Sequence, residues 1–263
     1  MSTIAVPEYS VITERPDNRA SRLQLRILQT RYDFAARLSA GQVVLEAACG
    51  AGVGLGMLAG TAEYVVGGDI DPSNCASARE SYAARTNLSV MNMDVERTPF
   101  QAGVFGVVVL FEALYYLKDA ATFLKEARRL LTPNGVLLIS TVNCEWAEFN
   151  PSPFSTKYHG AAELRTLLAI NGFDADLFGA FPDIKTGTKA ALTGRIKQFA
   201  VKHRLIPRTM KGKEWLKRVF HGKLEPIPRD LAFTVQEVEP LVPLDSCTDA
   251  SQYRMLYALC RPQ

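Results

Sequence analysis

The spacing of hydrophobic residues changes character near Gln42. Residues 18–39 carry apolar side chains at helical spacing, which predicts an N-terminal helix. Beyond them, short apolar runs alternate with helical stretches, and the runs lie at residues 43–47, 64–70, 88–94, 105–111 and 135–141. Because these runs are apolar on both faces, they are typical of a parallel sheet covered by helices. The pattern predicts an α/β, doubly wound fold with right-handed crossovers.

The C-terminal third extends this sheet. We expect a helix at 161–170, a strand at 173–181 and a last strand at 253–260, which together predict a mostly parallel, seven-stranded sheet. About seventy residues between the last two strands are not needed by the sheet. We therefore divide the chain into a sheet domain, an N-terminal helical lid and a basic helical insertion that caps the site. These comprise residues 1–182 with 253–263, residues 1–40 and residues 183–252, respectively.

The composition narrows the class of protein. Of 263 residues, 48% are hydrophobic and 22% are charged, as in soluble globular proteins. The five cysteines are scattered without a CxxC pair, which argues against a disulfide framework and against a zinc site. No signal peptide is evident at the N-terminus, and no apolar run approaches the roughly 20 residues that span a bilayer. We expect a cytoplasmic protein with no bound metal.

The main chemical signal is the glycine-rich turn after the first apolar run, in VVLEAACGAGVGLGMLA (43–59). Gly50 and Gly52 lack side chains where the backbone turns tightly and a ligand can approach it. Glu46 lies at the end of the strand before this turn, where a dinucleotide would place its pyrophosphate. A carboxylate repels a pyrophosphate but attracts the ammonium and sulfonium groups of S-adenosylmethionine (SAM). The alternative interpretation of Glu46 is a surface carboxylate at a strand end.

Two more acidic residues follow the second and third runs. Asp69, about 20 positions after the turn, can accept hydrogen bonds from ribose hydroxyls, and Ile70 can pack on an adenine. Asp94 can accept from the adenine amino group, while the amide of Val95 donates to a ring nitrogen. The alternative for Asp69 is a helix N-cap, a role for which Asp71 is better placed. Because the three acids end three consecutive strands, they predict one ligand site at that edge of the sheet.

The strings LEAACGAG, GGDIDPSN, MDVERTPF, FGVVVLFEALYYLKD and LLTPNGVLLIS resemble, in this order, the motifs of class I SAM-dependent methyltransferases. The resemblance covers residues 42–142, with a looser similarity to about residue 182. It is strongest to the broad group of ubiquinone/menaquinone-type and small-molecule enzymes. The resemblance implies a Rossmann-like methyltransferase fold, SAM as cofactor and S-adenosylhomocysteine as product.

The resemblance also assigns roles to individual residues. The methionine part of SAM would lie against Glu46, Ala48, Gly50 and Gly52, the ribose at Asp69, the adenine at Asp94 and Val95, and the methyl donor near Phe111, Glu112 and Tyr116. The segment RYDFAA (31–36) resembles the lid helix of related enzymes, so Tyr32 is a further candidate for cofactor contact, with core packing as the alternative. The chain departs from the family at Ala48, where Gly is usual, at Gly106, where Asp is frequent, and at Tyr116, where His is frequent.

Catalysis depends first on alignment, because the sulfonium already activates the methyl group, and then on exclusion of water. A hydroxyl or protonated amine acceptor also benefits from a general base. The catalytic candidates are Glu112, Tyr116 and His159, with Asn143 and Tyr158 as others near the strand ends. Of the three histidines, only His159 lies in a segment that could reach the site; a plain loop histidine is the other interpretation.

The insertion is strongly basic. Residues 185–230 hold 13 Lys or Arg against 3 Asp or Glu, although the net charge of the chain is only +3. Two amphipathic stripes run through it, made by Leu192, Ile196, Phe199 and His203 and by Trp215, Leu216, Val219 and Phe220. The stripes could pack on the sheet domain. The charges could instead bind an acceptor with phosphate or carboxylate groups or dock on an anionic membrane surface. RNA binding ranks last, since the aromatic residues lie on the apolar stripes, and we expect no DNA partner.

These features favour a SAM-dependent methyltransferase that acts by O- or N-methylation on a small-molecule or glycan-like acceptor, which could be anionic. Three alternatives stay open at this point. The acceptor could be lipid-like and reached through peripheral contact with a membrane surface. The protein could be an NAD(P)-dependent oxidoreductase, against which Glu46 argues. It could also be an inactive SAM-binding module, an interpretation that Ala48 and the absent histidine support.

Overall fold

The structure of the chain, a computed structural model, describes residues 13–16, 18–183, 224–231 and 237–263. The helices are α1 (Arg22–Leu38), α2 (Leu55–Ala59), α3 (Pro72–Ser81), α4 (Ala120–Leu130) and α5 (Ala161–Ile170). The strands are β1 (Arg19–Ala20), β2 (Val43–Ala47), β3 (Tyr64–Asp69), β4 (Leu88–Asn92), β5 (Phe105–Phe111), β6 (Leu131–Val142), β7 (Phe173–Pro182), β8 (Glu225–Pro226), β9 (Val242–Leu244) and β10 (Tyr253–Pro262). Short 3₁₀ helices lie at Leu114–Tyr116 and Ala250–Gln252.

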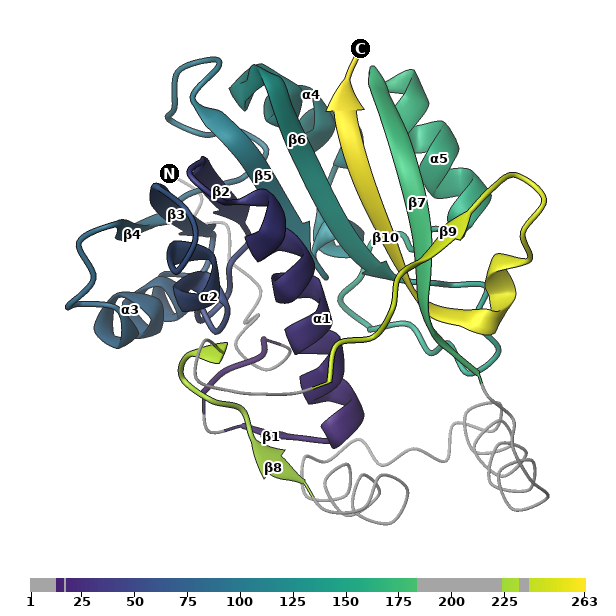
Figure 1. Cartoon of the computed structure of the whole chain (residues 1–263), viewed down its shortest axis with the longest axis horizontal. Helices are drawn as coiled ribbons and strands as arrows, with labels where there is room; N and C mark the ends of the chain where they lie inside the picture. Colours follow the sequence, from purple (N-terminus) through teal and green to yellow (C-terminus); the bar gives the residue numbers. More distant parts are fainter. Residues whose placement is uncertain (1–12, 17, 184–223, 232–236) are drawn as a thin grey trace, which may run out of the picture.

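One eight-stranded sheet forms the centre of the molecule, in the order β4-β3-β2-β5-β6-β10-β7-β9 (Figure 1). The first five strands in this order are parallel, whereas β10 is antiparallel to both β6 and β7. The predicted doubly wound, mostly parallel α/β fold is confirmed. The sequence predicts seven of the strands. The eighth, β9, pairs with β7 and has only three residues, too few to show an alternating pattern.

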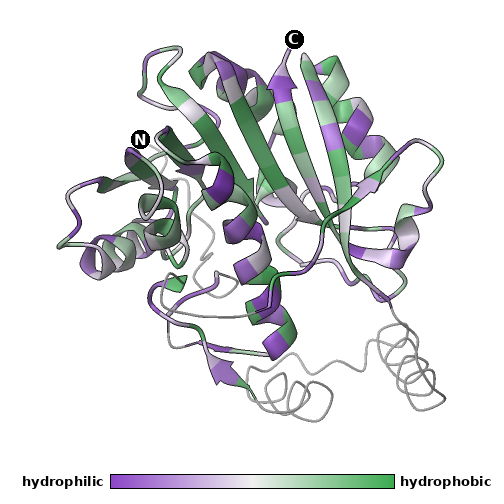
Figure 2. Cartoon of the chain, viewed as in Figure 1, coloured by the Kyte–Doolittle hydropathy of each residue, from purple (hydrophilic) through white to green (hydrophobic). Residues whose placement is uncertain are grey.

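Helices cover both faces of the sheet. One face carries α1, α2 and α3, which share a buried core that includes Leu28, Leu55 and Ala78. The other face carries α4 and α5, whose buried residues include Phe123 and Leu168. The central strands are hydrophobic along most of their length (Figure 2), as strands buried on both faces require.

Local signals set the starts of the helices. A capping box begins α1, where the Ser21 hydroxyl accepts from the amide of Gln24 and the Gln24 side chain accepts from the amide of Ser21. Asp71 caps α3 by accepting from the amide of Ser73, and Pro72 occupies the first turn. Asp69 is therefore not the cap of α3, which leaves it available for another role.

The segment before α1 pairs with residues 224–231, which lie within the insertion. We call residues 13–16 and 18–20 the N-terminal strap. Its strand β1 pairs with β8, and the amide of Ile227 donates to the carbonyl of Asn18 (Figure 1). The amide of Leu231 donates to the carbonyl of Val53, in the turn that follows β2. The strap and residues 224–231 thus lie together beside the glycine-rich turn.

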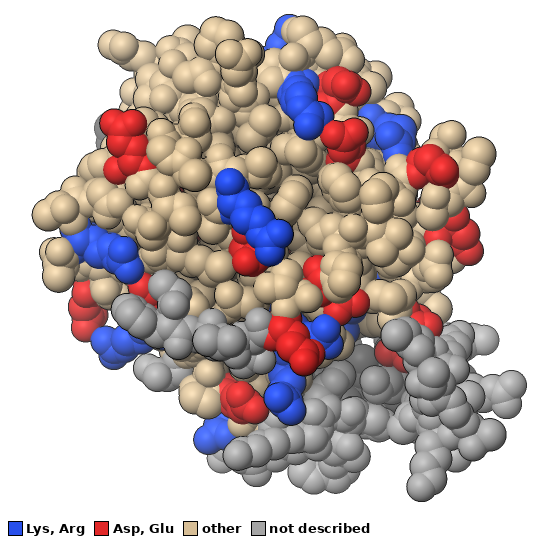
Figure 3. Space-filling view, in the orientation of Figure 1, with Lys and Arg blue, Asp and Glu red and all other residues tan. Residues whose placement is uncertain are grey.

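Most of the predicted basic insertion, including both amphipathic stripes, lies in residues 184–223, outside the described residues. On the face shown in Figure 3, the acidic and basic side chains of the described residues are interspersed. No helix in the described part of the chain has the length and apolar character needed to cross a bilayer.

Candidate active site

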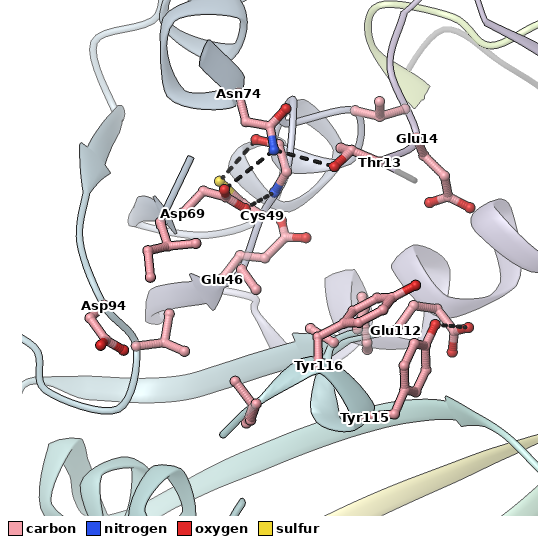
Figure 4. Close-up of a pocket in the computed structure, with 18 of the residues that line it drawn as sticks. Thr13, Glu14, Glu46, Cys49, Asp69, Asn74, Asp94, Glu112, Tyr115 and Tyr116 are labelled. Atoms are coloured by element: carbon pink, nitrogen blue, oxygen red, sulfur yellow. Dashed lines mark hydrogen bonds between the residues drawn. The ribbon is translucent and has the colours of Figure 1, made fainter. Parts of the chain in front are cut away.

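A cavity of about 250 Å³ opens at the carboxyl ends of the parallel strands. It is lined by the turns that follow β2, β3, β4 and β5, by α1 and by two residues of the strap. Because parallel strands end at the same edge of a sheet, side chains distant in sequence meet there. The three acids singled out in the sequence, Glu46, Asp69 and Asp94, all line this cavity (Figure 4).

Glu46 is the penultimate residue of β2 and is only 2% exposed, so it is not a surface carboxylate. The Tyr32 hydroxyl of α1 donates to its Oε1 over 2.5 Å, and the Tyr32 ring packs edge-on against Phe111. The other oxygen, Oε2, is buried without a hydrogen-bond partner among the described residues. Burial raises the pKa of Glu46 to about 7, although the Tyr32 bond opposes the rise. A buried polar atom without a partner is uncommon, and here it lies on a residue that lines the cavity, where a ligand group can reach it.

The turn after β2 brings bare backbone to the cavity. Ala48 and Gly50 both line it, and both have a left-handed backbone with φ near 56°. A Cβ at Gly50 would come within 2.8 Å of Cγ2 of Thr13, so only glycine fits between the turn and the strap. Ala48 holds the same conformation with a side chain, which is strained for an L-residue.

Gly52 differs from the sequence prediction, since it does not line the cavity. A Cβ at this position would lie 2.8 Å from Cβ of Ala78 in α3. Glycine at position 52 therefore lets the turn pack closely on α3. The sequence signal was the same as for Gly50, because both glycines follow the same strand, and only the packing distinguishes them.

Asp69 ends β3 and organises the neighbouring backbone. Its Oδ2 accepts from the amide of Gly50 over 2.8 Å, and its Oδ1 accepts from the amide of Asp71 over 2.9 Å and from the Asn74 side chain over 3.3 Å. Burial raises the pKa of Asp69, and these hydrogen bonds oppose the rise. The adjacent Ile70 presents an apolar side chain that is 41% exposed at the cavity. A hydrogen-bonding acid thus lies beside an apolar surface.

Asp94 follows β4 and is exposed at the cavity rim. Its Oδ1 accepts from the amide of Glu96 over 2.9 Å, which fixes the turn. Val95 lines the cavity and is buried. The carboxylate and the apolar side chain therefore stand next to each other at the end of the cavity that lies away from Glu112 (Figure 4).

Arg31 is a site residue that the sequence analysis missed. It lies on α1, is only 4% exposed and lines the cavity. Its Nη2 forms an ion pair with Oε2 of Glu14 in the strap, whereas its Nε and Nη1 are buried without a hydrogen-bond partner among the described residues. The guanidinium lies 5.3 Å from the ring centre of Tyr32 and 5.8 Å from that of Phe111. One sequence signal was available for Arg31, because it lies directly before the candidate Tyr32 in the segment 31–36. No sequence motif points to Glu14.

Glu112 forms the second buried carboxyl group of the cavity. It follows β5 in a left-handed conformation with φ 52°. Its Oε2 accepts from the Tyr115 hydroxyl over 3.1 Å, and its Oε1 is buried without a hydrogen-bond partner among the described residues. Burial raises the pKa of Glu112 to about 7, and the positive charge of Arg31 opposes the rise. The Tyr115 ring stacks on Tyr158 at 4.3 Å, so this tyrosine is held in place; the sequence analysis passed over it in favour of its neighbour Tyr116, which also lines the cavity.

Two other candidates are not brought to the site. His159 is buried but does not line the cavity, and burial lowers its pKa. The prediction of a catalytic role for His159 therefore has no geometric support. Asn143 donates through its side chain to the carbonyls of Ala250 and Tyr253, which anchors the start of β10. Among the described residues, no group of three or more His, Cys, Asp or Glu side chains could hold a metal ion.

Comparisons with known proteins agree with this geometry. Residues 45–139 match a family described as a methyltransferase domain. A protein of Mycolicibacterium smegmatis, named a probable S-adenosylmethionine-dependent methyltransferase, is 36% identical over 157 residues, which cover 57% of this chain and 59% of that protein. A ubiquinone biosynthesis O-methyltransferase of Bradyrhizobium diazoefficiens is 31% identical over 112 residues, 41% of this chain and 43% of that enzyme. The chain thus spans about three fifths or less of the length of these relatives.

A solved structure extends the likeness to the whole fold. The crystal structure of a Thermotoga maritima protein, described as a SAM-dependent methyltransferase and possible histamine N-methyltransferase, superposes with a TM-score of 0.56. The alignment covers 90% of each chain at 14% sequence identity. At this identity the similarity concerns the fold alone.

Proposed function

We propose that this chain is a class I SAM-dependent methyltransferase that transfers a methyl group from SAM to a small-molecule acceptor. The family match over residues 45–139 and the similarity to a probable S-adenosylmethionine-dependent methyltransferase support this. The observation that carries the proposal is the unpaired, buried Oε2 of Glu46 in a cavity that Asp69 and Asp94 also line. A cationic nucleoside is the ligand class that three carboxyl groups on one cavity favour.

The residues present fit SAM along its length. Glu46 would face the ammonium group, beside the backbone of Ala48 and Gly50, where bare backbone leaves room for the chain of the amino acid. Asp69 would accept from the ribose hydroxyls, since each carboxylate oxygen can accept more than one hydrogen bond. Ile70 would pack on the adenine. At the far end Asp94 would accept from the adenine amino group, and Val95 would complete the adenine pocket with its side chain and its amide.

The carboxylate of SAM also needs a partner, and Arg31 supplies it. Its guanidinium is buried at the cavity and keeps two nitrogens without a hydrogen-bond partner among the described residues. A guanidinium is suited to a carboxylate because its N–H groups match the two oxygens. Because Glu46 and Arg31 both line it, the cavity offers a carboxyl group and a guanidinium to the two charged groups of an α-amino acid.

The chain's own residues would supply alignment and proton transfer. When bound, SAM supplies a methyl group on a positively charged sulfur. The thioether that remains is a good leaving group and needs no further activation. Glu112 would take the proton of the acceptor on its free Oε1, while the Tyr115 hydroxyl holds Oε2. A base with a pKa of about 7 has the right strength near neutral pH. Phe111, Tyr115 and Tyr116 would exclude water from this end of the cavity.

Three observations bear on the class of the acceptor. A wall of aromatic side chains next to Glu112 favours a small ring-bearing or glycan-like acceptor methylated on oxygen or nitrogen. One relative is named a ubiquinone biosynthesis O-methyltransferase, which supports methylation on an oxygen atom of the acceptor. The basic residues 185–223 favour an acceptor with anionic groups or a lipid-like acceptor at a membrane surface, and the cytoplasm is the compartment we propose.

Two measurements test the proposal in sequence. Isothermal titration calorimetry with SAM should give one-site binding, and NAD in the same cell should give no heat of binding. Incubation with methyl-labelled SAM and a metabolite extract should then transfer the label to a low-molecular-weight product found by mass spectrometry. Absence of SAM binding would overturn the proposal as a whole. Binding without any labelled product, from extracts or membrane lipids, would instead support an inactive SAM-binding module.

A further inference from the structure

The Arg31 guanidinium, to which we assign the carboxylate of SAM, is already paired with a carboxylate of the chain itself. Its partner is Glu14, whose Oε2 accepts from Nη2 of Arg31. Glu14 lines the same cavity, and its side chain extends from the strap toward the space that Glu46 borders (Figure 4). Among the described residues, Glu14 is the only carboxylate within ion-pair distance of Arg31.

The strap reaches the other end of the site as well. The Asn74 side chain donates to the Thr13 hydroxyl over 3.3 Å and to Oδ1 of Asp69 over the same distance. Thr13 also closes over Gly50, where a Cβ would meet its Cγ2 at 2.8 Å. One short segment is therefore linked through Asn74 to the acid assigned to the ribose, and it pairs directly with the cation assigned to the amino-acid end.

We propose that Glu14 holds the place of the cofactor's carboxylate, so that SAM binds by exchanging its own carboxylate for that of Glu14 at Arg31. This inference rests on the proposed function. The two carboxylates are chemically equivalent partners for one guanidinium. Glu14 is the more easily displaced of the pair, because its side chain is 39% exposed whereas that of Arg31 is 5% exposed. Released into solvent, Glu14 regains its hydration, while Arg31 must keep an anion because it is buried.

The neighbouring acids do not substitute for Glu14. Glu46 directs one oxygen to Tyr32 and Glu112 directs one to Tyr115, and burial holds the pKa of both near 7, so neither is a full negative charge at neutral pH. An internal competitor reduces the apparent affinity to the intrinsic affinity multiplied by the fraction of molecules in which the site is free. The strap thereby sets the SAM concentration at which the protein becomes loaded.

The experiment compares three ligands on two variants by isothermal titration calorimetry, with the full chain throughout. Glu14→Gln keeps the size of the side chain and removes its charge. Asp33→Asn is the matched control, since Asp33 lies on the same helix as Arg31 but pairs with the exposed Arg37. The ligands are SAM, S-adenosylhomocysteine and decarboxylated SAM, which lacks only the carboxylate.

We expect Glu14→Gln to bind SAM and S-adenosylhomocysteine about threefold to tenfold more tightly than the wild type, as loss of a partly exposed competing ion pair implies. Its affinity for decarboxylated SAM should stay within about twofold, because that ligand does not compete for Arg31. Asp33→Asn should match the wild type with all three ligands. Weaker SAM binding by Glu14→Gln would mean that Glu14 holds the cofactor directly, and an unchanged affinity would mean that no exchange occurs. Either result overturns the inference while leaving wild-type SAM binding, and with it the proposed function, intact.

Discussion

Two glutamates at neighbouring strand ends have nearly the same surroundings. Glu46, the penultimate residue of β2, and Glu112, directly after β5, each have a buried carboxyl group. Each accepts a hydrogen bond from one tyrosine hydroxyl, and each keeps one oxygen without a partner among the described residues. Burial raises the pKa of both to about 7. The burial, hydrogen bonds and pKa of the two residues therefore do not distinguish them. Any difference in their roles must come from the residues around them.

The neighbours of the two glutamates are indeed different. Glu46 lies between the backbone turn of Ala48 and Gly50 and the Tyr32 side chain of α1. These surroundings suit one ligand, the cofactor that we propose. Glu112 is followed by the aromatic pair Tyr115 and Tyr116. These side chains can contact many kinds of acceptor and do not specify one. We infer that the first glutamate binds and the second reacts. Mutations at the two positions should separate these effects.

The largest expected effect is the loss of methyl transfer in Glu112→Gln. The amide cannot accept the acceptor's proton, and removal of a general base lowers rates by about 100-fold or more. SAM affinity should stay within about threefold, because the charge that faces the ammonium is at Glu46. The measurement is the rate of label transfer from methyl-labelled SAM, with SAM affinity determined by calorimetry on the same sample. Glu63→Gln, an exposed carboxyl group, is the control.

A different pattern would contradict this division of tasks. If Glu112→Gln lost SAM affinity and transfer in the same proportion, Glu112 would be a binding residue. If it kept full transfer activity, the acceptor would need no base, as for a sulfur or carbon nucleophile that is already ionised.

The second effect concerns stability and its dependence on pH. The pKa of Glu46 is about 7 in the folded chain against 4.5 as its ordinary value, so the folded state binds the proton more tightly. Its contribution to stability is complete below about pH 4.5 and is lost as the pH rises through 7. Between about pH 5 and pH 8, the free energy of unfolding of the wild type should therefore fall by about 2 kcal/mol more than that of Glu46→Gln. Denaturant unfolding at both pH values measures this difference, and parallel curves for the two proteins would show that Glu46 is not the cause.

The part of the cavity that we assign to the cofactor was largely predictable from the sequence because its signals are local. Glu46, Asp69 and Asp94 each lie at the end of an apolar run or directly after it, and parallel strands bring such ends together whatever the details of packing. The prediction fails where a second segment decides the outcome. Gly52 resembles Gly50 in sequence, and only the contact with Ala78 gives it a different task.

The remaining contacts depend on segments that are distant in sequence. Arg31 pairs with Glu14 in a strap whose strand β1 is held by β8, about two hundred residues later. His159 lies in the loop after β6, whose Tyr158 stacks on the cavity residue Tyr115, yet His159 itself is buried outside the cavity. No periodicity or motif encodes contacts of this kind. A negatively charged residue in an otherwise unmarked segment, such as Glu14, gives no signal before the fold is known.

The third effect is the loss of SAM affinity in Glu46→Gln. The substitution keeps an oxygen that can accept from Tyr32, so the change is confined to the charge. We expect about tenfold weaker binding, which corresponds to about 1.4 kcal/mol. The loss should grow from about pH 6 to pH 8, since the wild-type carboxyl group becomes ionised over that range while the amide does not. Calorimetric titrations at both pH values test this, and a loss that is independent of pH would indicate a change of shape instead.

The smallest effect lies in the turn between the two glutamates. Ala48 has a φ of 56°, a conformation that an L-residue adopts at a cost of about 1 kcal/mol and glycine adopts freely. Glycine also loses more backbone entropy on folding, by about 0.5 kcal/mol or more. Ala48→Gly should therefore raise the free energy of unfolding by less than about 1 kcal/mol and leave SAM affinity equal or slightly higher. Ala51→Gly is the matched control in the same turn, because Ala51 is buried and its φ is not left-handed, so glycine there should lower stability instead. Equal destabilisation by both substitutions would mean that the left-handed backbone at Ala48 is not strained.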